Sequence, residues 1–297
     1  MTTSTRDATR LRSRALRDGA IVAGVIANAA LLYFLPRNFA WFVDAPSWWL
    51  INLDDLYGVA NESLTSFGAF RMAPVVAWLM YPLTLLPSYA VFLGVYLILN
   101  LAAVVALGGR WAPLLILAFP PVLLELLNAN VHLFMALGIW LGMRWPGAWA
   151  ILLLSKVTPG IGILWFAFRR EWRNLALALA TTAAIVAVGF VIAPTQWLEW
   201  FRSLALSASM AQVGDLPSLL VRLPLAALVI LYAARTDRAW LVPVGCVLAM
   251  PTIWLQSLAL LTACFPLYRE RARWERRGTD QREPAPAVAP TAAQARA

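Results

Sequence analysis

The sequence predicts an all-α fold, a polytopic bundle of transmembrane helices. Hydrophobic residues make up 61% of its 297 positions and charged residues only 13%, whereas an ordinary soluble domain carries about 25% charge. The apolar runs are far longer than the strands of a membrane β-barrel, and they do not alternate. This composition excludes a soluble globular domain. It also excludes disorder over most of the length, because disorder requires low hydrophobicity.

The net charge of +9 indicates membrane topology rather than nucleic-acid binding. The basic residues lie in short blocks at the ends of apolar segments, which is the pattern of cytoplasmic loops: 10–17, 169–173, 235–238 and 269–277. All but one of the 24 basic residues are arginine, which is typical of a GC-rich bacterial genome. We therefore expect a multi-pass protein of the bacterial plasma membrane, with both termini cytoplasmic and no nucleic-acid partner.

We expect a transmembrane domain over residues 19–268, between a cytoplasmic tail at 1–18 and a disordered basic cytoplasmic tail at 269–297. The first helix is predicted at 19–36. The interval at about 37–71 is polar and acidic, which places it outside, and its tryptophans favour the membrane interface. It is therefore predicted to be an outer loop with an amphipathic helix.

The uncharged run 72–109 is too long for one span of roughly 20 residues, so it is predicted to hold two helices. Pro82, Pro87 and Ser88 indicate the break between them. The helices predicted up to the second outer loop are 72–86, 88–108, 111–127, 130–145, 147–168 and 174–194.

A second outer loop is predicted at 195–215. Its apolar residues fall on one helical face, which favours an amphipathic helix lying on the membrane: Trp197, Trp200, Phe201 and Leu204. A further helix is predicted at 216–234. The uncharged stretch 239–268 lies between two basic runs, so it is expected to be a hairpin with its apex at Met250-Pro251-Thr252.

Two neighbouring carboxylates, Asp54 and Asp55, follow the first helix on the predicted outer face. A carboxylate partly shielded by aromatic side chains can accept the proton of an attacking hydroxyl, so both are candidate general bases. The alternative is a solvated loop acid or a helix cap, positions that aspartate favours. The residues alone leave both interpretations open.

Ionisable residues inside apolar segments are a second signal, because such groups are costly in a membrane and usually face a bundle interior. Lys156 lies mid-segment, Arg222 lies about two turns into its helix, and Glu125 lies near the inner end of its helix. A cation at this depth suits a lipid-linked phosphate, and Arg71 is a further candidate. The alternatives are snorkelling, an internal ion pair or an interfacial anchor. The single histidine, His132, is expected to be packed on the cytoplasmic side, away from the acids.

We expect no cofactor and no metal site. The chain has no phosphate-binding loop and no Rossmann glycine pattern, and its two cysteines lie in apolar runs away from any ligand cluster. Trp254 follows the expected break at Pro251, which makes it a candidate for lining a substrate cavity.

Several motifs occur in a recognisable order: Asp55-Leu56-Tyr57, Phe70, Pro74, Leu85-Leu86-Pro87, Asn128-Ala129-Asn130, and the basic block 169–173. The most telling stretch is Lys156-Val157-Thr158-Pro159-Gly160. Over about residues 50–205 this order resembles glycosyltransferase family 87, which belongs to the GT-C class of integral membrane glycosyltransferases. The segment at 71–74 departs from the family's aromatic and paired prolines.

The resemblance implies a GT-C-like bundle of about nine or ten membrane segments. It implies an inverting transferase that moves a sugar, typically mannose, from a polyprenyl-phosphate donor to a lipid or glycan acceptor on the outer face. Carried over to this chain, Asp55 or Asp54 is the general base, and the donor phosphate is held by Lys156 with Arg222 or Arg71. Tyr57 and Trp254 are then placed in the substrate cavity.

Two other functions fit the same features. A carrier or flippase for lipid-linked sugars would use the same cations and need no outer carboxylate. A non-catalytic membrane subunit with the same fold is the other alternative, and the short C-terminal half of the chain keeps it open.

Overall fold

The structure is a computed structural model that describes residues 3–34, 44–58, 68–210 and 217–270, and every regular element in these ranges is a helix. Three stretches are long and apolar enough to cross a membrane: Arg14–Phe34, Tyr89–Ala118 and Trp172–Ile192. A pair of bent helices gives up to one more. The all-α membrane fold is thus confirmed. Several segments that were expected to span as single helices are instead broken into shorter apolar pieces.

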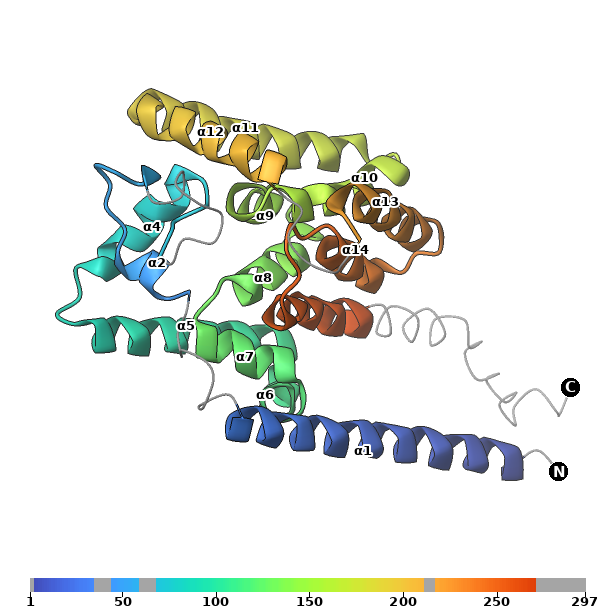
Figure 1. Ribbon diagram of the computed structural model, residues 1–297. Helices are drawn as coiled ribbons and strands as arrows, with labels where there is room; N and C mark the ends of the chain where they lie inside the picture. The colour runs from blue at the N-terminus through green and yellow to red at the C-terminus, as the bar shows by residue number, and fades with distance from the viewer. Residues whose placement is uncertain (1–2, 35–43, 59–67, 211–216, 271–297) are drawn as a thin grey trace, which may run out of the picture.

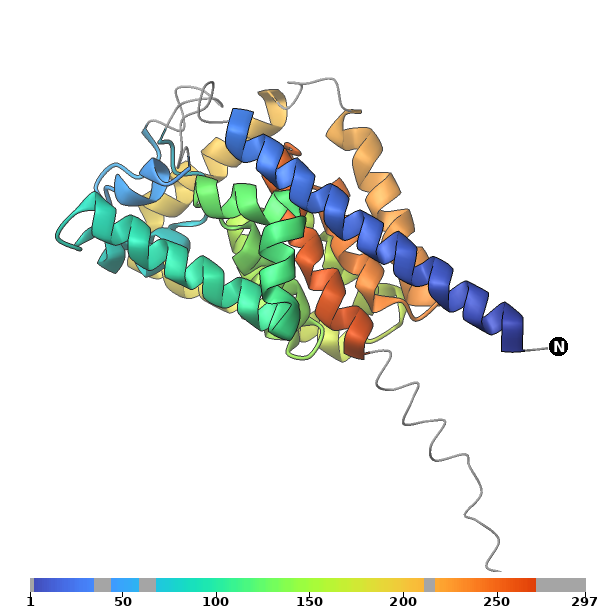
Figure 2. The same ribbon diagram turned by 90° about the horizontal axis from the view of Figure 1, so that it is seen from below.

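Helix α1 (Thr3–Phe34) is continuous and includes the basic segment that was expected to be a tail. It lies along one side of the bundle against α6 (Ala112–Ala118), and Figure 2, seen from the α1 side, shows it running across the other helices. Most of its hydrophobic window faces outward, with only 6% of that window buried. This is the position of a helix whose other faces contact lipid.

A proline pair explains how α1 is attached. Pro120 and Pro121 have no N–H group, so the carbonyls four residues earlier, of Ile116 and Leu117, lose their helical donors. The side-chain amide of Asn28 in α1 donates to both carbonyls, at 3.0 and 2.8 Å. The interhelical contact therefore satisfies polar groups that the break in the chain exposes.

The predicted break in the run 72–109 is confirmed, with helices α4 (Pro74–Thr84) and α5 (Tyr89–Gly108) on either side. Ser88 is the N-cap of α5, and its hydroxyl oxygen accepts a hydrogen bond from the N–H of Val91 at 3.3 Å. The short helix α2 (Pro46–Trp49) of the first outer loop packs against α4. Part of that loop, including Trp41 and Glu62, lies outside the described residues.

The region 111–145 differs from the two helices expected. It forms α6, then α7 (Pro120–Asn128) and α8 (His132–Gly142), and α7 and α8 meet at 117°. Ala129 in the turn adopts a left-handed conformation with φ of 53°. The turn contacts the first outer loop, because the backbone N–H of Asp44 donates to the carbonyl of Asn128. His132 therefore lies beside this loop, whereas the sequence predicted a position away from the acids.

The segment 147–168 is also broken, at Lys156. A short 3-10 turn (Pro146–Trp149) and α9 (Ala150–Ser155) precede it, and a 3-10 turn (Thr158–Ile163) and α10 (Leu164–Phe168) follow it. Lys156 itself is extended, with φ of −142° and ψ of 109°. Pro159 accounts for the break, because it cannot donate to the carbonyl at the end of α9.

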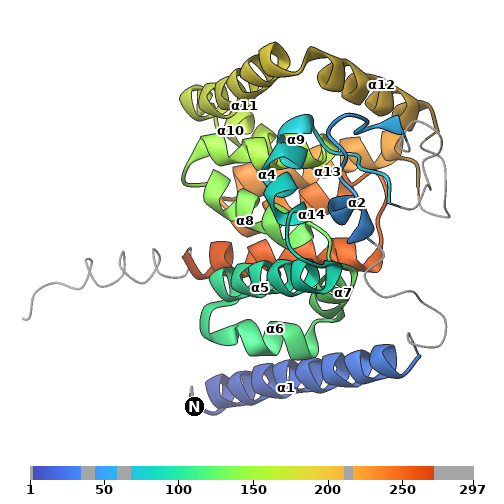
Figure 3. The same ribbon diagram turned by 90° about the vertical axis from the view of Figure 1, so that its left-hand side faces the viewer.

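Helices α11 (Trp172–Ile192) and α12 (Pro194–Met210) form an arch over the opposite side of the bundle from α1 (Figure 3). The expected helix of the second outer loop is therefore present. Trp197 and Trp200 are buried, and Trp197 packs against Gly189 of α11. Gln196 joins α12 to the first outer loop by donating to the carbonyl of Leu53 at 2.6 Å.

The C-terminal part has α13 (Leu219–Arg235), a 3-10 turn (Ala239–Leu241), α14 (Val242–Leu248) and a 3-10 helix (Leu255–Ala263), after which the chain stays helical to residue 270. The interruption between Leu248 and Leu255 is at the predicted apex. The final helix packs against both α7 and α8. The tail from 271 lies outside the described residues.

Candidate active site

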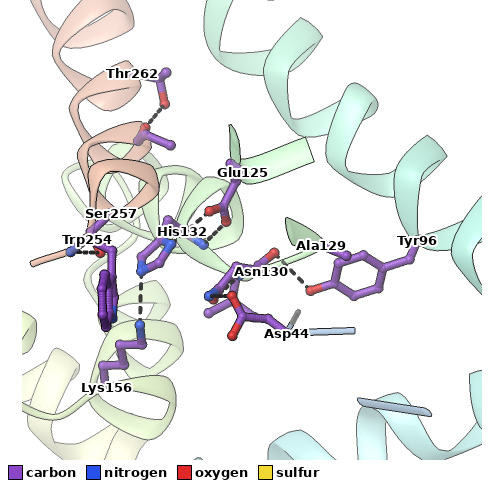
Figure 4. Close-up of polar contacts among 12 residues, drawn as sticks. Asp44, Tyr96, Glu125, Ala129, Asn130, His132, Lys156, Trp254, Ser257 and Thr262 are labelled. Carbon is purple, nitrogen blue, oxygen red and sulfur yellow. Dashed lines mark hydrogen bonds and ion pairs between the residues drawn. The ribbon is translucent and has the colours of Figure 1, made fainter. Parts of the chain in front are cut away.

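Three ionisable side chains from separate parts of the sequence form a hydrogen-bonded chain within the bundle (Figure 4). The Nδ1 atom of His132 lies 2.8 Å from Oε2 of Glu125, and Nε2 of His132 lies 2.9 Å from Nζ of Lys156. The side chains of Glu125 and His132 are 0% and 1% exposed. Lys156 as a whole residue is half-buried, and its ammonium group ends the chain of three side chains.

The local fold explains this arrangement. The turn between α7 and α8 brings His132 back over Glu125, whose Oε1 accepts the backbone N–H of His132 at 2.5 Å. This bond satisfies one of the free N–H groups in the first turn of α8. The break at Lys156 then places the lysine at the end of α9, from which its side chain reaches the imidazole.

The carboxylate determines the proton positions on the imidazole. An ionised Glu125 only accepts hydrogen bonds, so the Nδ1 atom that faces it carries the proton. The Nε2 atom is then an acceptor for the Lys156 ammonium group. A lysine has three donors, and one of them is used by this contact.

A fourth ionisable residue, Asp44 of the first outer loop, hydrogen-bonds to the turn between α7 and α8. Its Oδ2 accepts a hydrogen bond from the side chain of Asn130 at 2.5 Å, and its backbone N–H donates to the carbonyl of Asn128. Burial disfavours the charged carboxylate and raises the pKa of Asp44, while the bond from Asn130 and the charge of Lys156 act in the opposite direction. Sequence reasoning did not choose Asp44 as a site residue, although it lies in the same outer loop as Trp48 and Trp49.

Other contacts hold this outer loop on the turn. The indole N–H of Trp48 donates to the carbonyl of Ala129 at 3.1 Å, and the hydroxyl of Tyr96 donates to the carbonyl of Asn130 at 3.0 Å. The ring of Trp48 also stacks on Tyr96, with centroids 6.1 Å apart. Three successive carbonyls of the turn, at residues 128, 129 and 130, are therefore paired with groups outside it, and Asp44 is fixed at this turn.

Asp54 and Asp55, the carboxylates chosen from the sequence, lie elsewhere in the same loop. Both are exposed. Oδ1 of Asp55 accepts the backbone N–H of Gly58 at 3.0 Å, which is a local turn contact. Among the residues that the structure describes, neither carboxylate has a hydrogen bond to Glu125, His132 or Lys156.

Arg222 is buried and bonded to main-chain carbonyls. Its guanidinium group donates to four of them: Pro217 at 2.8 Å, Leu248 at 3.2 Å, Met250 at 2.6 Å and Pro251 at 2.9 Å. These carbonyls belong to the start of α13 and to the interruption after α14. The geometry gives Arg222 a structural role there, and its role in phosphate binding stays a prediction, as does that of the half-buried Arg71.

The two residues expected in the substrate cavity differ in exposure. Tyr57 is fully buried, and its hydroxyl donates to the carbonyl of Met72 at 2.5 Å, which ties the loop to the start of α4. Trp254 is 61% exposed and directly precedes the 3-10 helix that packs against α7 and α8. Trp254 therefore stands near the helices that carry Glu125 and His132, whereas Tyr57 has its polar atom committed to the backbone.

The sequence was compared with models of known protein families, and the model of glycosyltransferase family 87 matches residues 70–278. This match covers well over half of the chain. The chain belongs to glycosyltransferase family 87. No curated protein and no solved structure matched it. The protein is therefore a membrane-bound glycosyltransferase, as the resemblance in the sequence implied.

The range matched by the model of glycosyltransferase family 87 includes only some of the candidate site residues. Glu125, His132 and Lys156 lie inside it, whereas Asp44, Asp54 and Asp55 precede its first residue. Within the described ranges, no group of three or more His, Cys, Asp or Glu side chains is placed to hold a metal ion. What the cluster offers a ligand is the ammonium group of Lys156, whose charge acts on the carboxylate of Asp44, a group with a raised pKa.

Proposed function

We propose that this enzyme transfers a sugar, typically mannose, from a polyprenyl-phosphate donor to a lipid or glycan acceptor on the outer face of the membrane. One observation carries the proposal: the only lysine of the chain stands at an unwound break between short apolar helices and interacts electrostatically with Asp44. Broken helices with a charged side chain are tolerated in membranes where they line a polar site. A phosphate on a lipid tail reaches such a site from the bilayer.

In the proposed reaction, Lys156 balances the charge of the donor phosphate. The acceptor hydroxyl attacks the anomeric carbon, its oxygen forms the new glycosidic bond, and its proton passes to an outer-loop carboxylate. The bond from the anomeric carbon to the phosphate oxygen breaks with inversion, and the electron pair leaves with polyprenyl phosphate. The leaving group gains negative charge as the bond breaks, so a cation fixed beside it stabilises the transition state.

Asp44 is the carboxylate that the geometry favours as this base. Its pKa is raised by burial, and Asn130 fixes one of its oxygens next to the turn that carries His132. A base with a raised pKa accepts a proton more readily than a solvated aspartate does. Asp55 and Asp54 remain the alternatives, and Trp254 remains a candidate for contact with the substrate.

Transfer in proteoliposomes tests the proposal. Wild-type protein is supplied with radiolabelled polyprenyl-phosphate mannose and a crude bacterial lipid extract, beside Asp44→Asn, Asp54→Asn, Asp55→Asn and Lys156→Met. We expect Asp44→Asn to lose roughly 100-fold or more of the rate, as removal of a general base does. We expect Asp54→Asn and Asp55→Asn to retain most of it.

The same assay separates the alternatives. Loss of transfer in Asp55→Asn or Asp54→Asn alone would return the base to the residue chosen from the sequence. Transport of the lipid-linked sugar without transfer, unaffected by all three aspartate variants, would support a carrier. Failure of wild type to transfer or to bind the donor would overturn the proposed donor.

A further inference from the structure

We propose that Glu125 and His132 are positioning residues that hold Lys156 charged and directed toward the donor phosphate. The phosphate in this statement rests on the proposed function, whereas the relay from carboxylate to imidazole to ammonium group rests on the geometry alone. The two residues would not touch the substrate. They would act through Lys156, whose remaining N–H groups face the ligand.

Both carboxylate oxygens of Glu125 contact His132. Its Oε1 accepts the backbone N–H of His132 at 2.5 Å, and its Oε2 faces Nδ1 at 2.8 Å. Two bonds to one residue fix both the ring orientation and the protonated nitrogen, as a carboxylate does for a metal-binding histidine. A buried carboxylate with no other partner among the described residues is costly, so this pairing indicates a specific task.

The fixed tautomer of His132 in turn orients Lys156. With the proton on Nδ1, Nε2 presents a lone pair to the Lys156 ammonium group 2.9 Å away. The other tautomer would present an N–H group to the ammonium group, and two donors would then oppose each other. The identity of the protonated nitrogen, which Glu125 determines, thus decides whether Lys156 is held or displaced.

The charges also favour this arrangement. An isolated ammonium group inside a helical bundle is strongly disfavoured, so a lysine there needs a counter-charge. Glu125 supplies one across the imidazole, and Asp44 adds a second charge nearby. Among the described residues, the ammonium group of Lys156 hydrogen-bonds to His132 and to neither carboxylate, so two of its three donors are left for an anionic ligand.

The chain contains one histidine and one lysine, so each can be isotopically labelled as a single site. In detergent-solubilised protein labelled with ¹⁵N-histidine, NMR at neutral pH should show a protonated Nδ1 and an unprotonated Nε2. Glu125→Gln should abolish this single tautomer. A wild-type ring protonated at Nε2 and not at Nδ1 would overturn the relay, because Nε2 could then not accept from Lys156.

Binding separates positioning from a purely structural role. Glu125→Gln and His132→Phe should each raise the dissociation constant for polyprenyl monophosphate roughly tenfold, the effect of about one hydrogen bond. His132→Gln should recover part of the loss, since its amide oxygen can replace Nε2 as an acceptor. In a Lys156→Met background, Glu125→Gln should add little, because the residue through which it acts is absent.

Glu270→Gln is the matched control. Glu270 is also a carboxylate bonded to α8, but it binds Trp140 and Arg144 at the opposite end of that helix. Equal effects of the Glu125 and Glu270 variants, or full additivity of Glu125→Gln with Lys156→Met, would overturn the positioning role. The expected tautomer without polyprenyl monophosphate binding by wild type would instead refute the proposed donor and leave the relay intact.

Discussion

Asp44 and Asp55 lie in the same outer loop, yet their surroundings give their carboxylates different chemistry. Asp55 is exposed and accepts a hydrogen bond from a local turn. Asp44 is half-buried and hydrogen-bonded to Asn130, and the charge of Lys156 lowers its pKa. The sequence spacing that drew attention to Asp55 carries no information on burial, which depends on a turn far away in the chain. This is why Asp44 could not be chosen from the sequence.

The interaction between Asn130 and Asp44 gives a prediction for the pH dependence of the enzyme. Burial raises the pKa of Asp44 above the ordinary value of 3.8, and the hydrogen bond from Asn130 lowers it again. Asn130→Ala removes that bond, so the pKa of Asp44 rises further. Because a base must be ionised, the acid limb of the kcat/KM profile should move to higher pH, which initial rates across the acidic range measure.

A second asparagine provides the control for this experiment. The side chain of Asn174 donates to Glu171 at 2.9 Å, at the start of α11 and away from the cluster. Asn174→Ala should leave the acid limb where it is in wild type. A limb that stays in place in Asn130→Ala, or moves to lower pH, would show that Asp44 is not the base that controls the rate.

Lys156 was identifiable from the sequence, whereas its partners were not. A single lysine in an apolar segment is unusual enough to stand out. Glu125 was noticed for the same reason, but its link to His132 depends on the 117° bend between α7 and α8. Counting membrane crossings assumes that each apolar segment spans as a single straight helix, and the bent pair of α7 and α8 does not form one. The family-level prediction survived this error because it rested on local motifs.

At the scale of helices, each break leaves backbone carbonyls without their helical donors. Groups on other segments supply the missing donors. The break before α5 was predictable because Pro82, Pro87 and Ser88 lie in one long apolar run and Ser88 is a good N-cap. The break between α6 and α7 was missed because only Phe119 separates the two helices. A proline shows where a carbonyl loses its helical donor, but it does not show which side chain replaces that donor.

Arg222 supplies hydrogen-bond donors of this kind, and its contacts give a prediction about stability. Its fork of N–H groups reaches four carbonyls, one just before α13 and three at the end of α14 and the interruption after it. A lysine ammonium group is a compact point charge and cannot match that span. Arg222→Lys should therefore lower the stability by about 2 kcal/mol or more, a fall of roughly 4–8 °C in melting temperature. Thermal unfolding in detergent measures this loss.

The comparison variant is Arg238→Lys. Arg238 is half-buried, and its one side-chain hydrogen bond in the described residues is an exposed bond to the hydroxyl of Tyr232, so its replacement should change the melting temperature by little. If Arg222→Lys kept the wild-type melting temperature but raised the KM for the polyprenyl-phosphate donor, Arg222 would be a phosphate ligand, as first expected from the sequence.

For the whole molecule, the helix bundle contributes Glu125, His132 and Lys156 to the site, and the loop that precedes it contributes Asp44. The family match begins at residue 70, after α1 and the first outer loop. The loop nevertheless supplies Asp44, and its Trp48 pairs with the turn that carries His132. Since α1 directly precedes this loop, its attachment to α6 constrains where the loop starts. Figures 1 and 3 show α1 along one side and α12 on the opposite side.

The contact between α1 and α6 can be tested by a single methyl group. A Cβ atom at Gly24 would lie 1.9 Å from the carbonyl oxygen of Ala118, a backbone atom that cannot rotate away. Gly24→Ala must therefore push α1 outward, which also lengthens the bonds from Asn28 to α6. Small residues at helix contacts in membranes allow this close approach. We expect a loss of about 1–3 kcal/mol from this overpacking.

Gly19→Ala separates the clash from the general effect of adding alanine to a helix. Among the described residues, no atom beyond the adjoining residues and backbone of α1 lies within 4 Å of a Cβ built at Gly19, so this variant should be neutral or gain up to about 1 kcal/mol from the better helix former. Thermal unfolding of both variants in one detergent, together with their transferase rates, measures the difference. Equal stability would mean that α1 does not pack on α6. If Gly24→Ala lost stability and transfer while Gly19→Ala kept both, the anchoring of α1 would be required to hold the outer loop, and with it Asp44, against the bundle.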